Sequence, residues 1–388
     1  MSEALNIRPE RRGELDALRG VAAVCVVAYH ALALHPPSRE AMWALFCSPL
    51  YPLATGRPAV ILFFVLSGFV LHGALSAERR ATGRVDIGAF ALKRFCRIWP
   101  PFAAAGLLAA AVAAAASVFA TLPAQLLPAP MRGWPEDGYG LAALARHLTL
   151  DGIERHLALN SVSWSLVYEL RVALLLPVLS ILIVRARGAT LAVGVGLAIL
   201  ADVALSASAQ ESLAERNYQA FGDIGLSLLG TVYCLPMFLL GAATSESLRR
   251  SELGIERLGP RGALCVFALA WGLMWFPNDA LVAVGAATLV ALAARAVPAR
   301  SALNRAAPLF FGRISYSLYL VHLPWLYGAV LILGGVIGVG PAIVFGLASL
   351  PPVALLFRIC VELPSQQIGR GLGRRLSERR RASSPEPV

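Results

Sequence analysis

Two histidines lie inside apolar stretches of the sequence, where burying a titratable side chain is costly and therefore indicates a function. His30 follows Arg19 by eleven residues, about 16 Å along a helix, and His322 follows Arg313 by nine residues, about 13 Å. With Arg19 at a membrane interface, His30 would lie near the middle of the bilayer. A neutral imidazole there can accept a proton from a substrate. The alternative for either residue is a structural histidine that forms a hydrogen bond within the packing.

Arg94 and Arg97 form a second group that is suited to chemistry. Residues three apart share one face of a helix, so both guanidinium groups would point the same way. The planar guanidinium matches phosphate oxygens with paired hydrogen bonds. Their place at the start of an apolar stretch predicts a cytosolic anionic ligand. The alternative is that they are ordinary arginines on the cytoplasmic side of a membrane span.

Glu169 lies five residues after Trp164, which begins another apolar stretch. Its carboxylate would orient a histidine, as the third member of a catalytic triad does, or bind the hydroxyls of a sugar. Trp164 and Tyr168 are one helical turn apart and would offer an aromatic face for a sugar ring. The alternative is an aromatic belt at the membrane surface, with Glu169 paired to Arg171.

Two further patterns surround these residues. Tyr316 and Tyr319 share a helical face in the segment that ends at His322, which indicates a substrate-binding role for Tyr316 and His322. Ser67 and Gly68 lie inside an apolar stretch, where small residues permit close packing of helices. We therefore interpret this pair as a packing site and not as a nucleophile.

The composition indicates what kind of scaffold must position these side chains. The chain has 388 residues, of which 57% are hydrophobic and only 15% are charged, with a mean hydropathy of +0.67. Soluble proteins carry about a quarter charged residues, so an ordinary soluble enzyme is excluded. The apolar content excludes a disordered chain, and 6 dispersed cysteines exclude a disulfide scaffold. The sequence predicts an all-α, polytopic integral membrane protein.

A membrane-spanning helix needs about 20 mostly apolar residues. About ten transmembrane helices are expected on this basis, at residues 15–34, 56–75, 98–120, 164–184, 189–208, 221–243, 261–277, 279–297, 308–333 and 338–360.

The net charge of +11 is spread over the short loops between these segments. A nucleic-acid-binding protein would gather that charge on a polar domain, so we expect no nucleic-acid partner. Arginines are frequent in every second loop, whereas the long loop on the other side carries Glu136 and Asp137. This alternation predicts that both the N- and C-termini are cytoplasmic.

Three regions follow from these boundaries. They are a cytoplasmic N-terminus at 1–14, a transmembrane domain at 15–363 and a basic cytoplasmic tail at 364–388 that would meet anionic membrane lipid. The cysteines lack metal-ligand spacing, and no cluster of other metal ligands is visible, so we expect no metal.

Five motifs together resemble the membrane-bound acyltransferase-3 family over nearly the whole chain, from Leu15 to about Pro364. They are Leu15-Asp16-Ala17-Leu18-Arg19-Gly20 followed by His30, Phe63-Phe64-Val65-Leu66-Ser67-Gly68-Phe69, Lys93-Arg94-Phe95-Cys96-Arg97-Ile98-Trp99-Pro100, Ser163-Trp164-Ser165-Leu166-Val167-Tyr168-Glu169 and Ile314-Ser315-Tyr316-Ser317-Leu318-Tyr319-Leu320-Val321-His322. Each motif is weak alone, but five in the family's order form a specific signal.

The resemblance implies an O-acyltransferase in the bacterial inner (plasma) membrane. Such an enzyme transfers an acyl group, usually acetyl, from cytosolic acetyl-CoA or another acyl-CoA to a hydroxyl of a cell-surface carbohydrate or lipid-linked sugar. The family's Arg-x10-His pattern matches Arg19 and His30, and its Arg-x-x-Arg pattern matches Arg94 and Arg97. His30 would then be the general base and the three arginines would bind the donor.

Other readings of the same residues stay open at this point. Glu169 would orient His30 or bind the acceptor, and a covalent acyl-histidine is an alternative to general-base catalysis. Arg19 would either join the donor site or pair with Asp16. A proton-coupled transporter or flippase of a sugar also fits buried titratable residues in ten spans. A non-catalytic scaffold for polysaccharide assembly is the third reading, under which His30→Ala would have no effect.

Overall fold

The computed structural model describes residues 13–132, 134, 141–150, 159–209 and 224–382. Within these ranges the chain forms helices and turns and contains no β-strand, so the expected all-α class is confirmed. The acidic residues Glu136 and Asp137 of the long loop lie outside the described residues, as do residues 1–12 of the N-terminus.

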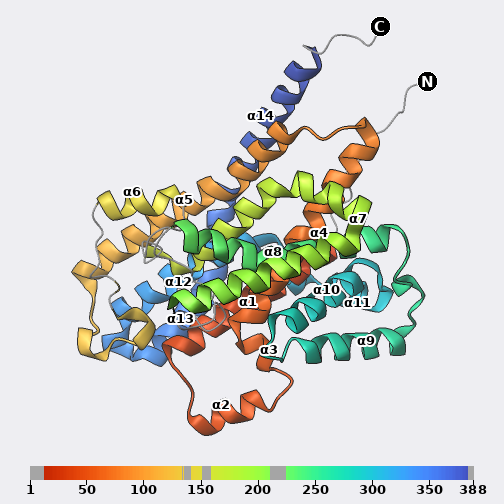
Figure 1. The fold of residues 1–388 in the computed structure, drawn as a ribbon. Coiled ribbons are helices and arrows are strands. Elements are labelled where there is room, and N and C mark those ends of the chain that lie inside the picture. The colour runs from red at the N-terminus through yellow and green to blue at the C-terminus, as the bar shows by residue number, and fades with distance from the viewer. Residues whose placement is uncertain (1–12, 133, 135–140, 151–158, 210–223, 383–388) are drawn as a thin grey trace.

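The longer helices form the body of the bundle in Figure 1. They are α1 (Gly13–Leu34), α4 (Gly56–Thr82), α5 (Ile87–Phe119), α7 (Trp164–Ala209), α8 (Ile224–Arg249), α10 (Asp279–Arg295), α12 (Ala306–Ile337), α13 (Val339–Phe357) and α14 (Leu363–Ala382).

Shorter elements connect these helices and cover their ends. They are α2 (Arg39–Phe46), α3 (Tyr51–Ala54), α6 (Leu141–Thr149), α9 (Pro260–Leu273), α11 (Val297–Leu303), the 3₁₀ turns η1 (Ala124–Leu126), η2 (Ala129–Met131), η4 (Ser161–Ser163) and η5 (Ile255–Arg257), and the π-helical turn η6 (Arg358–Glu362).

Seven helices of the described chain are long and apolar enough to cross a membrane, or eight if the bent pair α10 and α11 counts as one span. Each of the ten expected segments coincides with a helix, but the number of ten spans is not confirmed. The segments 164–184 and 189–208 both lie in α7, as two helical stretches on either side of a kink at Ala186, where the backbone leaves helical geometry. The 14-residue α9 is about 21 Å long, shorter than a hydrocarbon core of about 30 Å.

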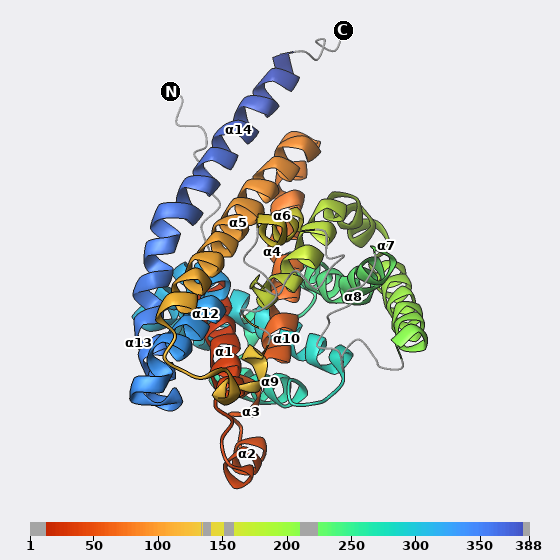
Figure 2. The same ribbon diagram turned by 90° about the vertical axis from the view of Figure 1, so that its left-hand side faces the viewer.

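One end of the molecule, here called the basic end, comprises the C-terminal end of α4, the N-terminal end of α5 and the whole of α14. Figures 1 and 2 show α14 lying beside α5 as both extend past the rest of the bundle. The basic tail expected at 364–388 is therefore helical as far as Ala382 and packs on α5. This end carries the arginine-rich sequence that predicted a cytoplasmic location.

Glycines set how closely the central helices approach one another. A Cβ atom on Gly20 of α1 would lie 2.3 Å from the backbone nitrogen of Gly312 on α12. A Cβ atom on Gly68 of α4 would lie 2.0 Å from the carbonyl oxygen of Phe238 on α8. Both helix pairs thus touch backbone to backbone, as small residues permit inside membranes. The packing role expected for Gly68 is confirmed.

Prolines inside the helices release backbone carbonyls, and neighbouring side chains bind them. Pro324 lacks the N–H that would bond to the carbonyl of Leu320, and the side-chain amide of Asn160 donates to that carbonyl at 2.8 Å. Pro100 likewise frees the carbonyl of Cys96, which accepts the hydroxyl of Ser365 from α14. A helix in lipid needs such partners because no water is present to replace them.

We predict opposite effects for two glycine-to-alanine substitutions. Gly68→Ala should lower the free energy of unfolding by about 1–3 kcal/mol, because the new methyl group meets the backbone of α8. Gly196→Ala in α7 should raise it by up to about 1 kcal/mol, because nothing lies near its Cβ position and alanine favours helix. Thermal unfolding in one detergent measures both, and equal shifts would contradict the close contact of α4 and α8.

Candidate active site

His30 of α1 and His322 of α12 lie against each other and form what we call the histidine pair. The Nε2 atom of His322 is 3.2 Å from the Nδ1 atom of His30, and the ring centroids are 5.0 Å apart. Each histidine follows its helix's contact glycine, Gly20 or Gly312, by ten residues. Because the glycines fix where the two helices touch, the two histidines reach the same depth. His322 is fully buried, whereas His30 is partly exposed.

The hydrogen bonds of the pair assign a proton to each ring. The Nδ1 atom of His322 is 2.8 Å from the carbonyl oxygen of Tyr319, which can only accept, so Nδ1 carries the proton. In a neutral ring the Nε2 atom of His322 is then an acceptor, and the Nδ1–H of His30 donates to it. The same Nδ1 atom of His30 lies 2.9 Å from the carbonyl of Val26, which also requires a donor. His30 therefore keeps its free lone pair on Nε2.

Three arginines lie closer to the basic end than the histidine pair does, and we call them the arginine cluster. Arg19 comes from α1, and Arg94 and Arg97 come from α5. Arg19 and Arg94 are both close enough to the negative charge of Glu169 to be attracted by it, and Arg19 is also attracted by Glu362. Both arginines are repelled by the positive charge of Arg97, and Arg94 is also repelled by Arg19. Helices α1, α5 and α7 and the turn η6 thus bring together groups that are far apart in the sequence.

The members of the arginine cluster differ in their hydrogen bonding. Arg19 donates to Asp16 at 3.2 Å, which confirms the pairing with Asp16 considered from the sequence. Arg94 and Arg97 have no hydrogen bond or ion pair among the residues that the structure describes, and the buried Nε atom of Arg94 has no partner there. A buried guanidinium donor without a partner is costly, which indicates an anionic ligand at this place.

Glu169 belongs to the arginine cluster and not to the histidine pair. Its carboxylate accepts a hydrogen bond from the hydroxyl of Ser67 at 3.0 Å. In the described part of the chain it makes no hydrogen bond to His30, so the group that orients His30 is His322. Ser67 therefore positions a carboxylate as well as permitting close packing, which the sequence pattern did not indicate.

Of the aromatic residues expected in the site, Tyr316 lies near the arginine cluster, whereas Trp164 and Tyr168 are buried together in the bundle. Tyr316 donates its hydroxyl to the carbonyl of Ile98 at 3.0 Å and so links α12 to α5 near the arginine cluster. Trp164 and Tyr168 are 8% and 0% exposed, and their rings contact each other. The structure thus places this aromatic pair inside the packed bundle in its present conformation.

Two polar residues that the sequence reading did not single out also shape the site. Glu362 of η6 accepts the hydroxyl of Ser317 at 2.7 Å and adds a second carboxylate to the arginine cluster. Asn160 holds the Leu320 carbonyl, two residues before His322. A carboxylate directly after an apolar run was the available signal for Glu362, whereas nothing in the sequence marked Asn160. In the described ranges no group of three or more His, Cys, Asp or Glu residues could hold a metal ion.

Comparison with known proteins gives one match. A family model described as an acyltransferase domain, of the acyltransferase-3 type, matches residues 12–358. The match contains the histidine pair, the arginine cluster and every transmembrane element up to the π-helical turn. No curated protein and no solved structure matches the chain.

We predict that the Asn160 amide supports α12 at the histidine pair. Asn160→Ala should lower the free energy of unfolding by about 1–3 kcal/mol, because it leaves the Leu320 carbonyl buried without a donor. Ser163→Ala is the matched control, since the buried Oγ atom of Ser163 has no partner among the described residues and its removal should cost little. Thermal unfolding of both variants tests this, and an equal loss would contradict the assigned role.

Proposed function

The chain belongs to the acyltransferase-3 family, and on that premise we propose that it transfers an acyl group, in the first instance acetyl, from acyl-CoA to a carbohydrate hydroxyl. The acceptor class is a cell-surface carbohydrate or a lipid-linked sugar, and the location is the bacterial inner membrane. The observation that carries the proposal is the histidine pair, in which His322 leaves His30 with a free Nε2 lone pair.

His30 is the general base of the proposed reaction. Its Nε2 atom removes the proton of the acceptor hydroxyl while the hydroxyl oxygen attacks the thioester carbonyl carbon. The tetrahedral intermediate collapses as the carbon–sulfur bond breaks, and the leaving thiolate takes the proton from His30. The products are the O-acyl ester and free CoA thiol, and His30 returns to its neutral form without a net gain or loss of protons.

His322 is a positioning residue in this scheme. By accepting the Nδ1–H of His30, it holds the ring with Nε2 facing away from α12. When His30 becomes protonated during the reaction, its Nδ1–H can still donate to His322, so the hydrogen bond persists through the cycle. His322 itself is fixed by the carbonyls of Tyr319 and Leu318.

Arg94 and Arg97 are proposed to bind the phosphates of the donor. Within the described residues the buried Nε atom of Arg94 has no hydrogen-bond partner, and the guanidinium groups of both residues would supply directed donors for phosphate oxygens. Arg19 and His30 are eleven residues apart on α1, so the arginine cluster lies about 16 Å from the catalytic histidine along that helix. An extended acyl-CoA has the same layout, with its phosphates at one end and its thioester at the other. The negative charges of Glu169 and Glu362 offset part of the positive charge of the arginine cluster.

We predict that His30→Ala lowers transfer about 100-fold to 10,000-fold, which is the usual contribution of a general base. The measurement is transfer of radiolabelled acetyl from acetyl-CoA into a carbohydrate or lipid-linked fraction by membranes that contain the protein. His322→Ala should reduce transfer less, and the double variant should match His30→Ala, because His322 acts through His30. Activity should also fall in acid, since a protonated His30 has no lone pair to offer.

Other outcomes of this assay would replace the proposal. Labelled sugar that crosses vesicles without consumption of acyl-CoA would establish a carrier. Full transfer by His30→Ala would remove His30 from the chemistry, provided that the variant is present in the membrane at the wild-type level.

We predict that Arg97→Ala raises the KM for acyl-CoA about ten-fold or more while kcat changes little, because a charge-assisted hydrogen bond to the donor is lost. Arg313→Ala is the matched control, since Arg313 is an exposed arginine on α12 and should leave KM unchanged. Steady-state kinetics over a range of donor concentrations separates the two constants. A fall in kcat at constant KM would place Arg97 in the chemical step instead.

A further inference from the structure

The C-terminal helix α14 packs on α5 through two glycines that are one turn apart. A Cβ atom on Gly369 would lie 2.6 Å from Cβ of Cys96, and one on Gly373 would lie 3.2 Å from Cγ of Lys93. Figure 2 shows the two helices running side by side at the basic end. Their close approach creates a surface groove that is separate from the histidine pair and the arginine cluster.

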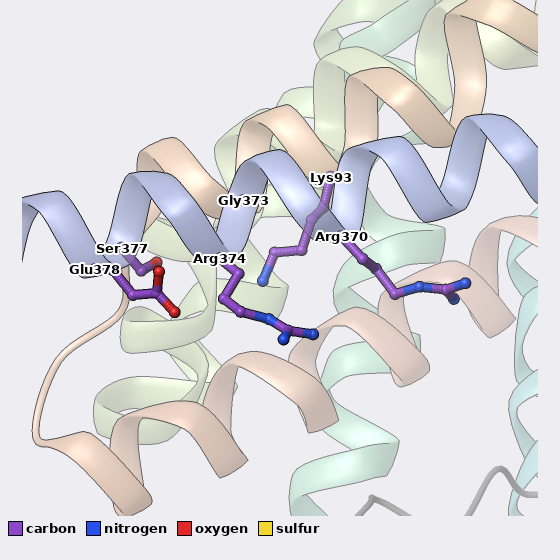
Figure 3. A pocket seen from close by; sticks show the side chains of 6 residues that line it. All are labelled: Lys93, Arg370, Gly373, Arg374, Ser377 and Glu378. Carbon is purple, nitrogen blue, oxygen red and sulfur yellow. The ribbon is translucent and has the colours of Figure 1, made fainter.

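The groove between α5 and α14 is a hollow of about 480 Å³ that gathers positive charge. Its lining residues are Lys93, Arg370, Gly373, Arg374, Ser377 and Glu378. Figure 3 shows Lys93, Arg370 and Arg374 pointing to the same side of α14, with Glu378 one turn further along the helix. None of these three cations has a hydrogen bond or ion pair within the ranges that the structure describes.

Unpaired like charges in one hollow repel each other, and a bound anion would relieve that repulsion. The only lysine of the chain, Lys93 of α5, lines the groove together with Arg370 and Arg374 of α14. Ammonium and guanidinium groups together are the usual partners of phosphate. The volume is in the range of sites that hold a small molecule or a headgroup.

The surroundings of the groove indicate a lipid. Ile368 and Leu372 of α14 are 58% and 43% exposed and lie at the same level of the helix as Arg370, on a different face from the groove. Exposed apolar side chains at the same depth as unpaired cations are typical of the boundary between acyl chains and headgroups. We propose that the groove between α5 and α14 is a binding site for the phosphate headgroup of an anionic phospholipid.

The lining of the groove includes none of the three arginines of the donor site proposed above. Lys93 contacts Gly369 and Gly373 of α14, whereas Arg94 interacts with Glu169 of α7, so the two neighbouring residues project from different faces of α5. A bound lipid would hold α14 against α5 from outside. The Ser365 hydroxyl, which caps the Cys96 carbonyl one residue before Arg97, would then stay in place.

The test is native mass spectrometry of the full chain in a zwitterionic detergent during titration with phosphatidylglycerol. The variants Lys93→Gln, Arg370→Gln and Arg374→Gln are compared with wild type, singly and together. Each lost cation should weaken phosphatidylglycerol binding about five-fold. The matched control is Arg375→Gln, an exposed arginine on the same helix that does not line the groove, and it should bind as wild type does. Phosphatidylcholine should not compete.

Several results would overturn the proposal. Equal losses in Arg375→Gln and the groove variants would mean that general surface charge attracts the lipid. Wild-type affinity in the combined groove variant would place lipid binding elsewhere. Displacement of phosphatidylglycerol by CoA, with CoA binding lost in the groove variants, would make the groove part of the donor site. Thermal unfolding in the same detergent verifies that the variants are folded, and each single variant offers a check if the combined one is not.

Discussion

The backbone contact between α1 and α12 at Gly20 and Gly312 is the constraint on which the site depends. The Cβ position of each glycine is already occupied by backbone of the other helix. Ten residues further along, about 15 Å at the helical rise, His30 and His322 meet. A larger residue at either crossing point would separate the helices and with them the two rings, because packed interiors cannot absorb an added side chain without shifting.

Polar side chains in this bundle serve backbone groups as well as chemistry. Proline weakens a helix by freeing a backbone carbonyl, and a neighbouring side chain binds that carbonyl at two such places: Asn160 at the carbonyl freed by Pro324, and Ser365 at the carbonyl freed by Pro100. These covered points lie beside His322 and Arg97. The irregular helices that would be costly in lipid are thus supported at the residues proposed for catalysis and donor binding.

Local sequence patterns predicted the helices and the pairing of Arg19 with Asp16, because each depends on spacing within one segment. The contact of His30 with His322 was not predicted, since the residues are 292 apart and meet only through the crossing of two helices. Glu169 was expected to orient His30 or to bind the acceptor, and its hydrogen bond to Ser67 was not predicted, for the same reason. The count of ten spans is not confirmed, because two of the expected segments lie in α7 on either side of its kink at Ala186 and because α9 is short for a span.

The placement of Arg19 and His30 on one helix has a consequence for how the proposed substrates meet. The arginine cluster lies on the side of the basic end, and the histidine pair lies further along α1, at the level where Tyr319 of α12 donates to the carbonyl of Val162 just before α7. A donor held by its phosphates at the arginines would present its thioester to His30 from one side only. The acceptor hydroxyl must then approach Nε2 of His30 from the side away from His322, since the Nδ1 edge of the His30 ring is already hydrogen-bonded to His322. Under the proposed function, the two substrates would therefore reach the base from different directions.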